Sequence, residues 1–242
     1  MSLSLEKLKI CIIVPAFNEA DNIFKTLEEI TALKIQTAVV VIDDGSRDNT
    51  VEEAAKSKCS VVSLPFNLGI GGAVQTGFKF ADEHGFDIAV QVDGDGQHDV
   101  QYIEKIVEPV ISGQADLSIG SRFLPPFLGY QSSFVRRIGI NFFAYLISFL
   151  TQTKITDPTS GFRAYNRKMI KVFAAYYPQD FPEPEAILVA KRYHAKILEV
   201  PVKMRKREGG VSSIRYLRTL YYMIKVTFAI LLDKLKTKKE MK

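Results

Sequence analysis

Short apolar runs alternate with helical patterns through the first 120 residues, and this alternation constrains the fold more than any other feature. The runs are rich in Val and Ile, as buried strands are, and lie at 9–14, 37–42, 60–64, 87–92 and 116–119. Between them, apolar residues recur at helical spacing over 19–33, 48–56, 69–83 and 100–111. Strands joined by single helices predict an α/β domain with a mostly parallel, Rossmann-like sheet that helices cover on both faces.

Beyond residue 120 the patterns are less regular. We expect helices at 134–150, 184–193 and 216–236, and strands near 157–165 and 196–204. The chain of 242 residues shows no repeat and no linker that divides it. We therefore expect one large domain over residues 1–212, followed by a basic amphipathic helix within 213–242.

Positive charge is concentrated near the C-terminus. Residues 203–242 carry twelve Lys or Arg against three Asp or Glu, whereas the whole chain has a net charge of +5. Such a segment either binds phosphorylated or lipid partners or is a solvated face. It has no pattern of stacking aromatics, so nucleic acid is not an expected partner.

The sequence predicts no membrane span. The longest uncharged stretch, 138–153, has 16 residues, whereas a spanning helix needs about 20 apolar residues. Two cysteines are too few for a disulfide framework, and no secretory signal is visible. We therefore expect a cytoplasmic location.

Polar residues follow the predicted strands at their carboxyl ends, which is where parallel sheets bind ligands. Asp93 and Asp95 leave the strand 87–92 one residue apart, so they can share one Mg²⁺ or Mn²⁺ ion. Gln97 offers a further oxygen donor, and His98 is an alternative ligand. The other interpretation of this segment is an acidic turn.

Two more segments suggest nucleotide binding. Asp43 and Asp44 follow the strand 37–42 and can accept hydrogen bonds from a ribose or a base, or can serve in a turn and helix cap. The glycine-rich run 67–72 opens a helix and suggests a phosphate cradle. It does not match the dinucleotide fingerprint, because Val74 occupies the third glycine position.

Several arginines lie close to glycines or to one another, and arginine binds phosphate through two hydrogen bonds. They are Arg122, Arg136, Arg137, Arg163, Arg205 and Arg207. Glu183 and Glu185, each preceded by proline, are candidates for a general acid or base.

Taken together, these segments resemble family 2 glycosyltransferases of the GT-A fold, and within them the dolichyl- and polyprenyl-phosphate sugar synthases. The motifs that carry the resemblance are VPAFNE (14–19), DDGS (43–46), NLG (67–69), DGDGQH (93–98), GSR (120–122) and DPTSGFR (157–163). The resemblance extends from about residue 10 to about residue 213.

The resemblance implies a metal-dependent, inverting transfer of a sugar from a UDP- or GDP-sugar to a polyprenyl phosphate at the inner membrane face. The implied donor-binding residues are Pro15, Phe17, Asn18, Glu19, Asp43, Asp44, Gly71, Asp93 and Gly94. The implied ligands of Mg²⁺ or Mn²⁺ are Asp93, Asp95 and Gln97. The implied catalytic residues are Asp95, Arg122 and Glu185, and the implied acceptor-phosphate residues are Arg122, Arg136, Arg137, Arg163, Arg205 and Arg207.

Other interpretations remain open at this point. A saccharide hydroxyl acceptor would need a base, for which Glu183 or Glu185 is the candidate. The helices 138–150 and 216–242 either contact an anionic membrane surface or pack on the sheet, on a second copy or on a small membrane protein. A sugar-nucleotide-binding module without activity and a nucleotidyltransferase are rival classes. The second lacks support, because no glycine-rich basic loop follows the first strand.

Overall fold

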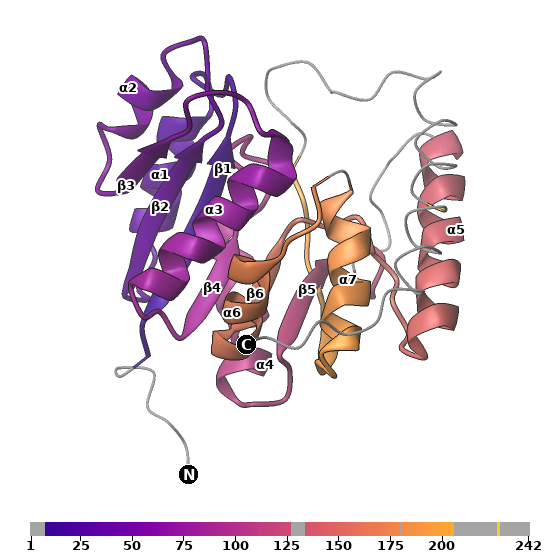
Figure 1. The fold of residues 1–242 in the computed structure, drawn as a ribbon. Coiled ribbons are helices and arrows are strands. Elements are labelled where there is room, and N and C mark those ends of the chain that lie inside the picture. Colours follow the sequence, from indigo (N-terminus) through magenta and orange to yellow (C-terminus); the bar gives the residue numbers. More distant parts are fainter. Residues whose placement is uncertain (1–7, 127–133, 180, 206–226, 228–242) are drawn as a thin grey trace.

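A computed structural model describes residues 8–126, 134–179, 181–205 and 227. Within these residues, seven strands form one sheet in the order β3-β2-β1-β4-β6-β5-β7 (Figure 1). The strands are β1 (Ile10–Ala16), β2 (Thr37–Asp43), β3 (Ser60–Ser63), β4 (Ile88–Gln91), β5 (Leu117–Ser121), β6 (Arg163–Asn166) and β7 (Ile197–Pro201). The α/β fold class and the mostly parallel sheet are confirmed.

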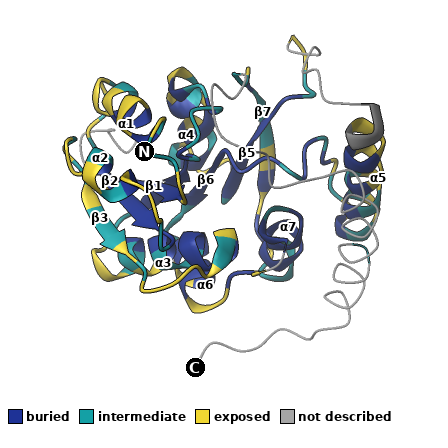
Figure 2. Ribbon diagram, turned by 90° about the horizontal axis from the view of Figure 1, so that it is seen from above, coloured by how far each residue is buried: buried dark blue, intermediate teal, exposed yellow. Residues whose placement is uncertain are grey.

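Helices cover both faces of this sheet, so the molecule has three layers (Figure 2). One face carries α1 (Ile23–Thr31), α2 (Thr50–Ala54) and α4 (Ile103–Ile111), the last preceded by a 3-10 turn at Val100–Tyr102. The other face carries α3 (Gly69–Glu83), α6 (Arg167–Ala175) and α7 (Pro182–Arg192), and α5 (Phe134–Thr151) packs against α7 at the side of the molecule (Figure 2).

Alternation along the strands explains why there are two apolar cores. Successive side chains of a strand point to opposite faces. In β1, Ile12 and Val14 pack with α1 and α4, whereas Cys11 and Ile13 pack with α3. All seven residues of β1 are buried, which explains why this strand is a continuous apolar run.

The strand β6 runs antiparallel to both of its neighbours, β4 and β5, whereas the other pairings are parallel. The chain therefore enters β6 at the same edge of the sheet where the parallel strands end. Residues 157–162, which precede β6, consequently lie beside the carboxyl ends of β4 and β5. Gly120 N donates a hydrogen bond to Phe162 O at 2.8 Å and fixes this placement.

One helix was not predicted. We expected no element between 166 and 183, but α6 occupies Arg167–Ala175. Asn166 caps it by accepting a hydrogen bond from Met169 N at 3.0 Å, and Met169, Ile170 and Phe173 are buried against the core. Apart from residue 227, the expected helix at 216–236 lies outside the described residues and stays a prediction, as does the boundary between residues 1–212 and 213–242.

Candidate active site

A cavity of about 700 Å³ opens at the carboxyl ends of β1, β2 and β4, where the sequence predicts ligand binding. The loops after β1 and β4 and the start of α3 form its walls. The predicted residues that line it are Pro15, Phe17, Asn18, Glu19, Asp44, Asp93, Gly94 and Asp95. The described lining does not include Asp43, Gly71 or Gln97, which were also predicted to bind donor or metal.

Hydrogen bonds hold the loop after β1 in place. Asn18 has a left-handed backbone with φ of 54°, a conformation that asparagine tolerates. Its amide N donates to Ser46 Oγ at 2.9 Å, and its side-chain Oδ1 accepts from Arg47 N at 2.8 Å. Glu19 N donates to Thr50 Oγ1 at 2.9 Å. The loop after β1, which lines the cavity, is thus hydrogen-bonded to the segment that follows β2.

Asp44 binds the N-terminus of α3 rather than leaving it open for a ligand. Its carboxylate accepts hydrogen bonds from Leu68 N at 2.7 Å and from Gly69 N at 2.9 Å. Burial raises the pKa of Asp44, and these two N–H groups oppose that shift. The sequence suggested that this helix end binds a phosphate. That expectation is wrong for these two N–H groups, because they already donate to Asp44. Asp43, which is buried, accepts from Ser46 N at 3.1 Å within the same turn.

Gly71 packs against the chain rather than facing the cavity. A Cβ atom at Gly71 would lie 2.4 Å from Pro178 O and 2.6 Å from Gln179 Cα. The glycine therefore allows α3 to approach the segment between α6 and α7. The sequence suggested a donor-binding role for Gly71, whereas its described close neighbours belong to the chain itself.

Asp93 and Asp95 lie together at the cavity, on the segment that follows β4. Asp95 Oδ1 accepts from Gln97 N at 3.0 Å, which curls the segment back on itself. The Asp93 side chain is 34 % exposed, so its carboxylate is accessible from the cavity. The described residues contain no cluster of three or more His, Cys, Asp or Glu suited to a metal ion.

The donor atoms present nevertheless fit a hard divalent cation. Mg²⁺ takes one or two protein carboxylates and completes its shell with water and substrate phosphates. Asp93 and Asp95 supply two such carboxylates, and a nucleoside diphosphate in the cavity would supply the phosphate oxygens.

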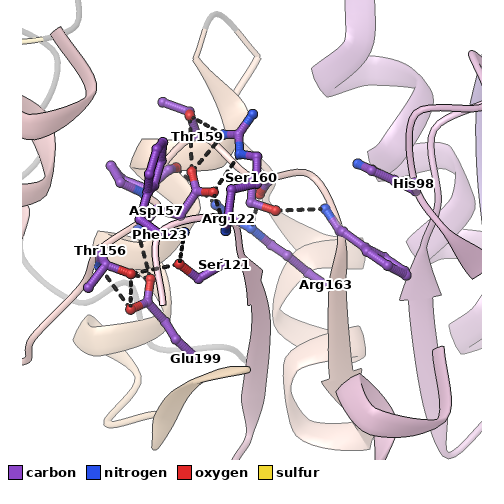
Figure 3. Close-up of polar contacts among 12 residues, drawn as sticks. His98, Ser121, Arg122, Phe123, Thr156, Asp157, Thr159, Ser160, Arg163 and Glu199 are labelled. Carbon is purple, nitrogen blue, oxygen red and sulfur yellow. Dashed lines mark hydrogen bonds and ion pairs between the residues drawn. The ribbon is translucent and has the colours of Figure 1, made fainter. Parts of the chain in front are cut away.

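Arg122 and Asp157 form a buried ion pair beside this cavity (Figure 3). The guanidinium donates through Nε to Oδ2 and through Nη2 to Oδ1, both at 2.6 Å. The same carboxylate accepts from Arg122 N at 3.1 Å, and Nη2 also donates to Thr159 Oγ1 at 2.8 Å. Arg122 is 5 % exposed and Asp157 is 0 % exposed, so this pair is fixed inside the protein.

Glu199 on β7 holds the backbone of Asp157 in place. From the sequence, no role was assigned to either carboxylate, Asp157 or Glu199. The Glu199 side chain accepts from Asp157 N at 2.8 Å, from Thr156 N, and from Thr156 Oγ1 at 2.8 Å. Asp157 stood within a recognised motif without a role, whereas Glu199 carried no local signal at all. The 42 residues between Glu199 and Asp157 explain this, because only the sheet brings them together.

The expectation that Arg163 binds the acceptor phosphate must be corrected, because its side chain is buried. It is 0 % exposed and donates to Ser160 O at 2.6 Å and to Pro158 O at 3.0 Å. It therefore fixes the loop before β6.

The remaining predicted arginines differ in placement. Arg205 forms ion pairs with Glu29 and Asp99 and is partly buried. Arg137 is exposed near the start of α5. The side chain of Arg136 and all of Arg207 lie outside what the structure describes.

The two glutamates of α7 occupy its first turn. Glu185 is buried at 8 % exposure. Glu183 is partly buried; burial raises the pKa of its carboxyl, which Arg163 and Arg122 oppose and Asp93 reinforces. Glu183 thus shares an electrostatic environment with the cavity and the Arg122 pair.

The family model described as "Glycosyl transferase family 2" matches residues 11–173. The chain belongs to this family. It is therefore a glycosyltransferase, as the cavity and the motifs around it had indicated.

Similar proteins include two with stated activities. The UDP-N-acetylglucosamine–dolichyl-phosphate N-acetylglucosaminyltransferase of Methanococcus voltae is 31 % identical over 80 % of this chain and 84 % of that protein. The polyprenol monophosphomannose synthase of Mycolicibacterium smegmatis is 29 % identical over 84 % of this chain and 80 % of its own length.

The fold matches a solved GT-A glycosyltransferase. Glucosyl-3-phosphoglycerate synthase of Mycobacterium tuberculosis, crystallised with Mn²⁺ and UDP-glucose, superposes with a TM-score of 0.71. It shares 21 % identity, and the match covers 97 % of this chain and 82 % of that one. The GT-A fold of the family 2 glycosyltransferase described here is thereby confirmed.

Proposed function

We propose that this glycosyltransferase moves a sugar from a nucleoside-diphosphate sugar to a polyprenyl phosphate, with Mg²⁺ or Mn²⁺ and with inversion at the anomeric carbon. The observation that carries the proposal is that Asp93 and Asp95 line one cavity together with the loop after β1 and the end of β2. The names of the two relatives given above, both of which use a lipid phosphate, support the acceptor.

The donor is proposed to lie in this cavity. Phe17, which is 43 % exposed, offers an aromatic surface for the base, and Asn18 and Glu19 offer polar groups. Asp93 and Asp95, with Gln97 nearby, would hold the metal against the diphosphate. A bound divalent cation would supply Lewis-acid stabilisation of the charge on the leaving diphosphate.

The acceptor phosphate is proposed to bind on the Arg122 side of the cavity. A phosphate monoester has a second pKa of about 6, so it is largely ionised at neutral pH and needs no general base. Its reaction depends on being held in line with the anomeric carbon. Arg122, positioned by Asp157, and Arg137, exposed on α5, are the described cations proposed for this task.

The membrane is proposed to deliver this acceptor along α5. No described helix is long and apolar enough to cross a bilayer. However, α5 exposes four large apolar side chains at spacings of four, three and four residues: Ile138, Phe142, Tyr145 and Phe149. Such a stripe can insert into a bilayer interface. We propose that the enzyme acts at a membrane surface through this stripe, and that this surface is the inner face.

The test is a screen of donors against acceptors. The purified chain is incubated with Mn²⁺ or Mg²⁺ and a panel of UDP-, GDP- and dTDP-sugars, with and without undecaprenyl phosphate, and nucleotide release is measured. We expect release that requires the lipid phosphate, is lost in Asp95→Asn and persists in Asp21→Asn, an exposed carboxylate outside the cavity.

The competing function is transfer to a saccharide hydroxyl, and the position of Glu183 favours keeping it in the test. A general base at Glu183 would need a raised pKa, and burial shifts the pKa of this carboxyl in that direction. Release that a saccharide supports and the lipid phosphate does not would refute our proposal. In that case Glu183→Gln should abolish release.

A further inference from the structure

His98 is buried directly behind the Asp93 carboxylate. Its side chain is 4 % exposed and stacks on the ring of Phe162, with centroids 4.8 Å apart and planes 9° apart. Both ring nitrogens face Asp93: Nδ1 lies 3.0 Å from Asp93 N, and Nε2 lies 3.5 Å from Asp93 Oδ2. The imidazole thus touches both the backbone and the side chain of one residue.

This arrangement fixes the tautomer of His98. Asp93 N–H is a donor, so Nδ1 must accept and carries no proton. The neutral ring then has its proton on Nε2, which points at the carboxylate. At 3.5 Å the Nε2–Oδ2 contact is longer than a hydrogen bond, so Nε2–H acts on the carboxylate electrostatically.

Other groups confine the same carboxylate. Gln91 Nε2 lies 3.4 Å from Asp93 Oδ1, whereas His98 Nε2 is near the other oxygen, Oδ2. A Cβ atom at Gly161 would lie only 3.1 Å from Oδ2, so the loop before β6 closes against the oxygens. Asp93 therefore has little freedom to rotate away from the cavity.

The imidazole is itself held by the fold. Phe162 immediately precedes β6, and the backbone of His98 pairs with that of Met204 beyond β7. Gln97 O accepts a hydrogen bond from Arg205 N at 2.9 Å. Segments far apart in the sequence consequently determine where the ring sits.

We infer that His98 is a positioning residue that aims the Asp93 carboxylate at the divalent cation. The inference rests on the proposed metal site of Asp93 and Asp95. In this role His98 is not a metal ligand, because its Nδ1 is occupied by Asp93 N–H and its Nε2 is directed at the carboxylate. Partners of metal-binding carboxylates typically change metal affinity by about 10- to 100-fold when they are removed.

Two substitutions separate the roles of the ring nitrogens. In His98→Asn, the amide oxygen can still accept from Asp93 N–H, but nothing replaces Nε2. In His98→Gln, the amide nitrogen can replace the Nε2 donor. His84→Asn is the control, because His84 also stacks on a phenylalanine, Phe80, but lies exposed at the end of α3.

The readout is binding of Mn²⁺ in the presence of UDP or GDP, measured from the electron paramagnetic resonance signal of free Mn²⁺. We expect His98→Asn to weaken Mn²⁺ binding about 10-fold or more, His98→Gln to weaken it less, and His84→Asn to leave it unchanged. Thermal unfolding of each variant verifies that it is folded. The KM for Mn²⁺ should rise more than kcat falls in His98→Asn.

A purely structural role for His98 makes a different prediction. Folded His98→Asn and His98→Gln would then bind Mn²⁺ as the natural chain does, and this result overturns the inference. Equal weakening in the two variants also overturns it, because the Nε2 contact would then have no effect. If Asp95→Asn binds Mn²⁺ normally, the metal site of the proposed function fails, and the role of His98 falls with it.

Discussion

Arg122 and Asp157 are joined by two parallel hydrogen bonds of 2.6 Å in the interior of the protein, 35 residues apart in the sequence. The carboxylate also accepts from the backbone of Arg122. The Asp157 side chain thus fixes the position of both the Arg122 guanidinium and the chain at the end of β5. Because Arg122 is a proposed acceptor residue, this pair connects stability with activity.

Removing the Asp157 charge should be costly. In Asp157→Asn the guanidinium of Arg122 stays buried without a counter-charge, and breaking such a pair costs about 3–5 kcal/mol. We expect the free energy of unfolding, measured by urea denaturation, to fall by that amount. A loss below about 1 kcal/mol would show that Arg122 finds another partner.

The double variant Arg122→Met, Asp157→Leu tests whether the pair serves stability or function. Apolar replacements of a buried ion pair are often neutral for stability. We expect the double variant to recover most of the loss seen in Asp157→Asn and to remain inactive in nucleotide release. Recovery of activity as well would contradict the role of Arg122 at the acceptor.

Gly161→Ala should impair activity more than stability. The added Cβ would lie 3.1 Å from both Asp93 Oδ2 and Gln91 Nε2, so the carboxylate must move. Misplacing a reacting group by 1 Å can cost about 100-fold in rate. We expect kcat/KM for the nucleotide sugar to fall by at least about 10-fold, as measured by nucleotide release.

Gly120→Ala is the matched control for that substitution. Its Cβ would also lie 3.1 Å from its neighbours, but these are the apolar side chains of Ile106 and Val202. We expect Gly120→Ala to lower the melting temperature while kcat/KM of the folded protein stays unchanged. Equal losses of activity in the two variants would argue that both act only through packing.

Glu199 should make stability depend on pH. Burial raises the pKa of its carboxyl above the usual 4.5, although hydrogen bonds from Asp157 N and Thr156 oppose the shift. The native state therefore holds this proton more tightly than the unfolded chain does. The resulting stabilisation is full below the unfolded pKa and is lost as pH rises through the native pKa.

Glu199→Gln isolates this contribution, because glutamine does not titrate. We expect the free energy of unfolding of the natural chain, minus that of the variant, to decrease as pH rises from about 4.5. Urea denaturation at pH values from about 4 to 8 measures the difference. A difference that increases with pH would mean that the hydrogen bonds outweigh burial.

The exposed stripe on α5 should bind lipid. Exposing or burying a large apolar side chain changes the free energy by about 1.5–3 kcal/mol. Replacing Phe142, Tyr145 and Phe149 by serine should therefore weaken co-sedimentation with anionic vesicles by at least about 100-fold. The control Phe24→Ser removes an apolar side chain that is 39 % exposed on α1 and should not affect binding. Loss of binding in both proteins would contradict a specific role for α5.

The cavity at the carboxyl ends of β1, β2 and β4 could be predicted from the sequence because its signals are local. Asp44, Asp93 and Asp95 follow apolar strands directly, and parallel strands bring their carboxyl ends to one edge. The pair of Arg122 and Asp157 could not be predicted in the same way. Its arrangement depends on β6 running antiparallel between β4 and β5, which no spacing in the sequence indicates.

Single residues were harder to place than elements. Arg163 and Arg122 lie in similar glycine-containing motifs, yet only the structure shows that Arg163 donates to backbone carbonyls in the interior. Gly71 was expected to bind the donor, and only the structure shows that it lies against Pro178 and Gln179. The helix α6 was missed because its buried face is short and its exposed residues are mostly basic.

The reversed strand β6 also has a consequence for how such enzymes diversify. Every described residue that lines the cavity precedes residue 100, whereas the Arg122 cluster is built from residues after 120. Among the described strands, only β6 is hydrogen-bonded to both β4 and β5. The sheet thus consists of two parts, β3-β2-β1-β4 and β6-β5-β7, and the pairing of β4 with β6 joins them. If the proposed donor and acceptor assignments hold, substitutions in the second part could change the acceptor while the first part, which lines the cavity, stays the same.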